Sequence, residues 1–76
     1  MASIQPRRAT QVLNESGNQV VYEDPFPGLG HTDHEPKWAC NVYINGKLLG
    51  RSCGHKNKKD AKEMAAVDAA ERLGLL

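Results

Sequence analysis

The segment Asn57–Leu73 constrains the fold more than any other part of the chain, because it is the longest stretch with a single helical period. Asn57 is a good N-cap residue, and Asp60 stands three residues later, where it can return a hydrogen bond to the cap. One narrow apolar stripe follows at helical spacing, formed by Ala61, Ala65, Ala66, Ala69, Ala70 and Leu73. Because these side chains are small, the pattern predicts a helix that packs closely on a flat β-sheet and ends at Gly74.

The first turn of this predicted helix carries the densest positive charge in the protein. Lys58, Lys59 and Lys62 lie within it, and Lys56 stands just before it. A helix N-terminus adds unpaired backbone N–H groups and the positive end of the helix dipole. These residues predict a phosphate-binding end, and the alternative is that the lysines only keep an exposed helix end solvated.

Charge is segregated along the sequence, although the formal net charge is only +1. Between Arg51 and Lys62 there are five Lys or Arg residues and one Asp. Between Glu15 and Pro36 there are five acidic residues and no Lys or Arg. A segregated basic patch attracts a polyanion even when the total charge is small, so the sequence is compatible with a nucleic-acid partner.

Length and composition indicate a single small domain spanning residues 1–76, of which 39% are hydrophobic and 25% charged. No apolar run approaches the roughly 20 residues that a membrane-spanning helix needs, so we expect no membrane partner. Residues 1–8 also lack the apolar core of a secretory signal. The two cysteines, Cys40 and Cys53, do not make a disulfide framework, and we therefore expect an intracellular location.

The first predicted element is a short helix over Ser3–Ser16, which Gly17 terminates. Its modest inward face is formed by Ile4, Ala9, Val12, Leu13 and Ser16. Gln11 and Glu15 are spaced i, i+4, so they project from one face beside this apolar stripe. They are candidate contact residues, with simple solvent exposure as the alternative.

A strand and a long loop are predicted next. Val20–Glu23 is β-branched and aromatic enough for a strand. The segment Asp24–Pro36 contains three of the four prolines and two glycines, so it predicts irregular structure. Long ordered loops in small domains are often functional, and this one contains His31 and His34.

The middle of the chain has the pattern of a β-hairpin. Lys37–Ile44 alternates with period two, as a half-buried antiparallel strand does. Asn45-Gly46 follows at once and predicts a type I′ turn, and Lys47–Cys53 is the returning strand with a bulge at Gly50. The inward face of the first strand contains Trp38, Cys40, Val42 and Ile44, and the outward face contains Ala39, Asn41 and Tyr43.

The predicted order is therefore helix, three-strand meander, helix. A three-stranded sheet could not bury Trp38, Val42 and Ile44 by itself, so both helices must cover its apolar face. The fold class is α+β, with the order α-β-β-β-α and two helices packed on one face of a three-stranded antiparallel sheet.

This order and several of its motifs closely resemble the double-stranded RNA-binding domain, over about Thr10 to Leu73. The most specific match is Lys58-Lys59-Asp60-Ala61-Lys62, which fits the KKxAK signature of that family and is followed by Ala65-Ala66 at the expected spacing. Leu13-Asn14-Glu15 is similar to the LNE of the family's first helix, and Val42–Lys47 to its hairpin.

The resemblance implies shape-selective binding of double-stranded RNA through two minor grooves and the phosphates of the major groove between them, with little sequence specificity. It further implies a module of an RNA-processing or RNA-silencing protein that is not itself catalytic, although the domain can belong to a longer enzyme such as an RNase III-type nuclease. No cofactor is implied. The implied minor-groove residues are Gln11, Glu15 and His34, and the implied phosphate-binding residues are Lys58, Lys59 and Lys62, with Asn57 as the cap and Lys56 in a lesser role.

The loop departs from the family pattern. His34 stands four residues before Trp38, as the histidine of the family's GPxH motif stands before its aromatic residue. His31-Thr32-Asp33 replaces the stiff Gly-Pro, and the connection is about two residues longer than usual. Asp33 and Glu35 add negative charge near the expected phosphates, which should weaken binding without abolishing it.

Three alternatives remain open at this stage. The first is a protein-interaction or homodimerisation module, since some members of the family have lost RNA binding; the intact lysine signature argues against it. The second is a zinc site from cysteines and histidines, but the paired spacings of a zinc finger are missing. The third is catalysis, for which the sequence offers no nucleophile-base pairing. We expect neither a catalytic nor a metal site.

Overall fold

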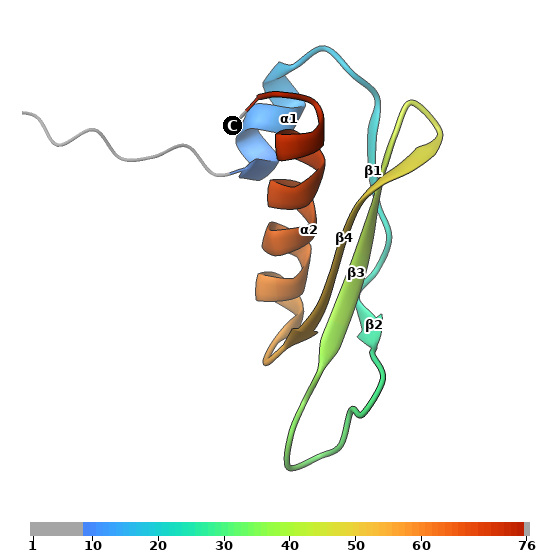
Figure 1. Ribbon diagram of the computed structural model, residues 1–76, viewed down its shortest axis with the longest axis vertical. Helices are drawn as coiled ribbons and strands as arrows, with labels where there is room; N and C mark the ends of the chain where they lie inside the picture. Colours follow the sequence, from blue (N-terminus) through green and yellow to red (C-terminus); the bar gives the residue numbers. More distant parts are fainter. Residues whose placement is uncertain (1–8, 76) are drawn as a thin grey trace, which may run out of the picture.

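The computed structural model describes residues 9–75, and Figure 1 shows two helices on one side of a β-sheet. The elements in chain order are α1 (Ala9–Glu15), β1 (Val20–Tyr22), β2 (Phe26–Pro27), β3 (Trp38–Ile44), β4 (Lys47–His55) and α2 (Lys58–Arg72). The predicted start of the first helix at Ser3 lies outside the described residues. The α+β class and the α-β-β-β-α order are confirmed.

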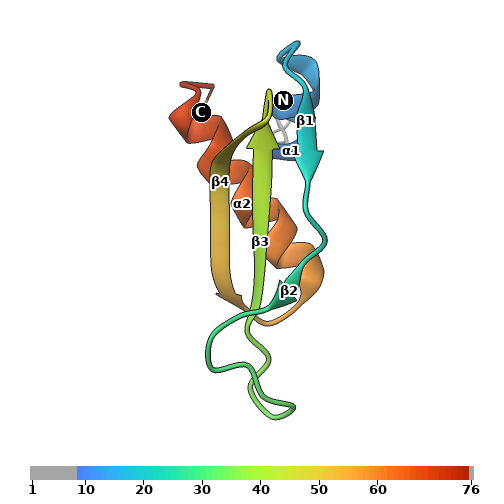
Figure 2. The same ribbon diagram turned by 90° about the vertical axis from the view of Figure 1, so that its right-hand side faces the viewer.

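Strand β3 is the centre of an antiparallel sheet. Val42 of β3 pairs with Tyr22 of β1 and with Gly50 of β4, so these two strands lie on opposite sides of β3. Strand β2 pairs with the start of β3 on the same side as β1. Figure 2 shows this arrangement, with β4 on one side of β3 and β1 and β2 successively on the other.

Strands β1 and β2 are therefore two pieces of one edge strand. The sheet has four strands but is only three strands wide, as predicted. The prediction for the loop was wrong in one detail: Phe26 and Pro27, predicted to be irregular, pair with Ala39 and Trp38. A proline is tolerated there because an edge strand does not need every backbone N–H for pairing.

The hairpin between β3 and β4 has the predicted turn. Asn45 and Gly46 both have positive φ, 52° and 83°, as a type I′ turn requires. The pairing of β4 then slips by one residue, because Val42 pairs with Gly50 and Tyr43 with Leu48; the bulge therefore lies at Leu49, next to the predicted Gly50. Strand β4 continues to His55, two residues beyond the predicted end.

Gly50 is needed because α2 lies directly over it. A Cβ atom at this position would fall inside the contact distance of the Ala65 carbonyl oxygen and only 2.7 Å from the Cβ of Ala69. The small residues of α2 and the absent side chain of Gly50 thus allow the close approach that the alanine stripe predicted.

The core lies between the helices and the sheet. The five alanines of α2 are buried, and the largest fully buried side chains are Leu13, Cys40 and Val42. Leu73 of the predicted stripe is half-buried. Ala39, on the outward face of β3, is also buried because the chain at Gly28 lies over it. The backbone N–H of Ala9 donates to Glu63 Oε1 (3.0 Å), which ties the first turn of α1 to α2.

Candidate nucleic-acid interface

The N-terminus of α2 is capped as predicted. Asn57 Oδ1 accepts a hydrogen bond from the backbone N–H of Asp60 (2.8 Å). In return, Asn57 Nδ2 donates to the carboxylate of Asp60 (3.1 Å). This reciprocal pair fixes the turn from which the lysines project and occupies one of the helix's unpaired N–H groups.

The three lysines of this turn are exposed, and two of them lie over aromatic rings. Lys58 Nζ is 4.8 Å from the centroid of the Trp38 ring, and Lys62 Nζ is 4.8 Å from that of Tyr22. Among residues 9–75, no ion pair involves these lysines, so their charge is not neutralised by a carboxylate. The aromatic partners were missed by the sequence analysis, which placed Trp38 in the core and Tyr22 in a strand.

Tyr22 presents a neutral ring to Lys62. Burial raises the pKa of Tyr22, and the negative charge of Glu63 raises it further. Its hydroxyl oxygen is buried and has no hydrogen-bond partner among the described residues. The interaction with Lys62 therefore belongs to the ring face, where the π-electrons attract a cation.

Helix α1 adjoins the lysine-bearing turns. A depression of about 360 Å³ is lined by Thr10, Asn14, Tyr22, Lys59, Lys62 and Glu63, so one face of α1 and the start of α2 form a continuous surface. Gln11 and Glu15 are exposed on α1, as predicted, but they do not line this depression. Thr10 and Asn14 were missed; their i, i+4 spacing was the available signal.

The loop after β2 extends from the end of the sheet nearest the start of α2 (Figure 1). Its His34 is exposed and shares a second depression, of about 590 Å³, with Lys37, Gly54 and Lys56. The structure therefore brings His34 beside Lys56, two of the predicted contact residues, although Glu35 also lines the depression.

His31 has a different place from His34. Its Nδ1 accepts a hydrogen bond from the backbone N–H of Lys37 (2.9 Å), and its ring contacts Trp38 edge-on, with the centroids 4.8 Å apart. Thr32 also braces the loop, since its Oγ1 accepts from the backbone N–H of Glu35 (2.9 Å). The loop lacks the Gly-Pro of the family pattern, and these contacts stiffen it instead.

The cysteines do not assemble a metal site in the part of the chain that the structure describes. Within residues 9–75, no group of three or more His, Cys, Asp or Glu side chains could hold a metal ion. Cys40 is buried and donates to the carbonyl oxygen of Glu23 (3.3 Å), whereas Cys53 is exposed. Burial raises the pKa of the Cys40 thiol, although nearby Lys62 acts in the opposite direction. Cys40 is thus a protonated core residue.

The comparisons with known proteins agree with this geometry. The capped, lysine-rich start of α2 next to α1 has the charge of a surface that attracts a nucleic acid. The family model described as the double-stranded RNA binding motif matches residues 13–73, and the chain belongs to this family. No curated protein and no solved structure gave a significant match.

Family membership makes this a domain for binding double-stranded RNA, and the family motif is a binding domain rather than a catalytic one. Gln11 precedes the matched residues, so its proposed role rests on its spacing from Glu15. In the described region, neither helix has the length and apolar character required to cross a membrane.

Proposed function

We propose that the domain recognises double-stranded RNA by shape, through two successive minor grooves and the phosphates of the major groove between them. The observation that carries this proposal is the position of the lysines at the capped N-terminus of α2, between α1 and the loop. Their ammonium groups, the helix dipole and the remaining unpaired backbone N–H groups all favour phosphate oxygens at this point.

The shape of the target explains the three-part surface. An A-form duplex has a deep, narrow major groove that side chains cannot read, and a wide, shallow minor groove that displays 2′-hydroxyl groups. A domain that contacts two minor grooves and the phosphates between them spans about 16 base pairs. Contacts to phosphates and 2′-hydroxyls carry little sequence information, so we expect weak sequence preference.

Each element has one role in this proposal. Gln11 and Glu15 of α1 accept hydrogen bonds from 2′-hydroxyls in the first minor groove, and His34 of the loop contacts the second. Lys58, Lys59 and Lys62 bind the phosphates, Asn57 holds their helix turn through its bond to Asp60, and Lys56 contributes beside His34.

The test compares duplexes of one sequence in RNA and DNA form by calorimetric titration at a fixed salt concentration. We expect the RNA duplex to bind more tightly, because only it has 2′-hydroxyls and A-form grooves. An RNA duplex of about half the 16-base-pair span should bind much more weakly, since it offers one minor groove. Equal affinity for the RNA and DNA duplexes would contradict the proposal.

A protein-interaction or homodimerisation role is the second candidate, and one surface favours it. Val21, Tyr43 and Leu48 are paired across β1, β3 and β4, so they form an apolar row on the sheet face that carries no helix. Val21 is 49% exposed and Leu48 is 45% exposed. Sedimentation of the domain with and without duplex RNA separates the two roles. A dimer that does not bind RNA would make protein interaction the better-supported function.

We also propose that the domain serves inside the cell as a module of an RNA-processing or RNA-silencing protein, where it delivers duplex RNA to a partner or to a neighbouring domain. Family membership supports this setting. Tagging the full-length gene product and recovering its bound RNA after crosslinking would test it; recovery without enrichment of duplex RNA would contradict it.

A further inference from the structure

We propose that Trp38 and Tyr22 are positioning residues, which hold the ammonium groups of Lys58 and Lys62 in place before RNA arrives. The inference rests on the proposed role of these lysines in binding phosphate. It adds two residues that lie on the sheet, outside the lysine signature of α2.

The two rings lie on the helix-covered face of the sheet. Tyr22 pairs with Val42, whose side chain is in the core, and Trp38 is four residues before Val42 on the same strand. Both rings are therefore on the face that packs against α2. Lys58 and Lys62 are spaced i, i+4, so one flank of the helix presents both ammonium groups to these rings, each at 4.8 Å.

Neutral rings suit a phosphate-binding lysine better than carboxylates do. The π-face attracts an ammonium group without cancelling its charge, so the lysine keeps its full attraction for a phosphate. Restricting the long side chain in advance also reduces the conformational entropy lost on binding. Lys59 differs, because the structure shows no aromatic partner for it among residues 9–75.

Tyr22 is the better of the two rings for a test, because its hydroxyl makes no hydrogen bond among the described residues. Tyr22→Phe keeps the ring, and Tyr22→Leu removes it while keeping an apolar side chain. In titrations with duplex RNA we expect Tyr22→Phe to bind like the wild type. Tyr22→Leu should bind about 2- to 5-fold more weakly, the size expected when the Lys62 side chain must be ordered on binding instead of in advance. Equal binding by the two variants would overturn the proposal.

A double-mutant cycle distinguishes positioning from general stabilisation. If Tyr22 acts through Lys62, Tyr22→Leu should cause no further loss of affinity in a Lys62→Ala background. In a Lys59→Ala background, which removes a lysine without a ring partner, the full loss should remain. A loss of equal size in both backgrounds would mean that the ring acts on the fold, which would overturn the proposal.

Nuclear magnetic resonance of the RNA-free wild type provides a readout that needs neither binding nor a substituted protein. Ring currents should shift the ε-methylene protons of Lys58 and Lys62 upfield, and those of Lys59 much less. Shifts without RNA binding would contradict the proposed function while supporting the positioning. Normal RNA binding without these shifts would overturn the positioning alone.

Discussion

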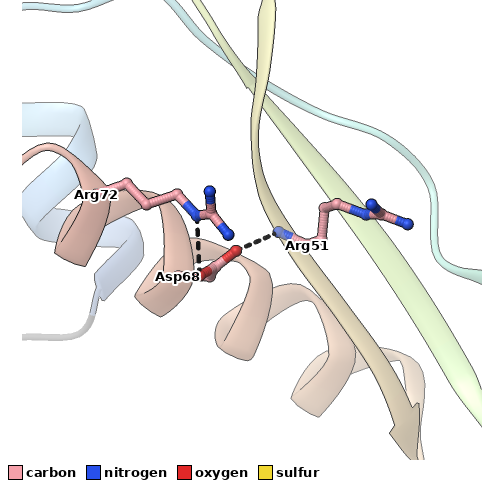
Figure 3. Close-up of polar contacts among 3 residues, drawn as sticks. All are labelled: Arg51, Asp68 and Arg72. Carbon is pink, nitrogen blue, oxygen red and sulfur yellow. Dashed lines mark hydrogen bonds and ion pairs between the residues drawn. The ribbon is translucent and has the colours of Figure 1, made fainter.

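The charged side chains at the two ends of α2 differ in their partners. At its start, exposed lysines lie over neutral rings, and their charge stays available to a partner. Near its end, Asp68 accepts a hydrogen bond from the backbone N–H of Arg51 (2.9 Å) and pairs with Arg72 Nε at 3.2 Å (Figure 3). The carboxylate of Asp68 is thus bonded to other residues of the protein, and it attaches α2 to β4.

This difference separates two roles along one helix. Removing charge at the start should cost RNA affinity and leave the fold intact, whereas removing charge near the end should cost stability and leave RNA affinity intact. Between them, the alanine stripe and Gly50 hold both ends on the sheet.

The largest effect should come from Gly50→Ala, which disturbs the middle of α2 and so affects both ends together. The added Cβ would collide with the backbone of Ala65 and with Ala69. We expect a loss of about 2–3 kcal/mol in the free energy of unfolding, measured by urea denaturation.

Gly54→Ala is the matched control for this substitution. Gly54 has φ +78°, and a Cβ atom added there would meet nothing within 4 Å, so alanine at this position causes backbone strain but no collision. It should cost about 1 kcal/mol. The close packing of α2 on Gly50 would be contradicted if the two substitutions were equally costly.

The next largest effect should be on RNA affinity. Replacing Lys58 and Lys59 together by alanine removes two proposed phosphate contacts. The slope of log K against log salt concentration should become shallower by about 1.5 to 2, near one unit per contact. Titrations at several salt concentrations measure this slope.

Thermal unfolding of the same double variant serves as the control. Because these lysines are exposed and make no ion pair in the described region, the melting temperature should fall by only a few degrees, through loss of the contact between Lys58 and Trp38. An unchanged salt slope would count against their role in phosphate binding.

Asp68→Ala should produce the converse result. It removes a charge-assisted hydrogen bond at a partly exposed site, so we expect a loss of about 1 kcal/mol in stability and no change in the salt slope of RNA binding. A variant that bound RNA more weakly without being less stable would contradict the division between the two ends.

The stabilisation by Asp68 should also depend on pH. Its pKa lies below the ordinary value of 3.8, mainly because the backbone N–H of Arg51 donates to the carboxylate, with Arg72 acting in the same direction. Since the folded-state pKa is depressed, this stability is present above the unfolded pKa and is lost as pH falls through the folded one. The stability difference between the wild type and Asp68→Ala should therefore be constant at neutral pH and shrink below about pH 4.

The smallest effects should come from the proposed minor-groove residues, which lie outside α2. Glu15→Ala and His34→Ala should each weaken RNA binding about 2- to 5-fold through lost hydrogen bonds. The salt slope should stay the same, because no phosphate contact is lost. A change in slope as large as that of a lysine variant would show that these positions meet the phosphate backbone instead.

The fold was predictable because its main signals are local. The alanine period of α2, the cap at Asn57, the alternation of β3 and the Asn45-Gly46 turn each lie within one short segment, and each has the predicted structure. Strand β2 was not predictable, because a proline such as Pro27 argues against a strand in the sequence. Only the structure shows that this segment lies at the edge of the sheet beside β3, where a proline is tolerated.

The candidate site was only partly predictable, because its supporting contacts join distant segments. The lysines are visible in the sequence, but the rings beneath them come from β1 and β3. The spacing from Trp38 separated His34 from His31 in the sequence, but the contact of the His31 ring with Trp38 could not be predicted. Thr10 and Asn14 required the packing of α1 beside α2.

The hydrogen bond from the backbone N–H of Arg51 to Asp68 also protects the open edge of the sheet. Strand β4 lies at the border of the sheet, where an unoccupied amide could template a strand from another molecule. Asp68 already occupies the amide of Arg51, so an incoming strand would have to displace a charged acceptor. We therefore expect this position of the β4 edge to be closed to strand addition by another molecule.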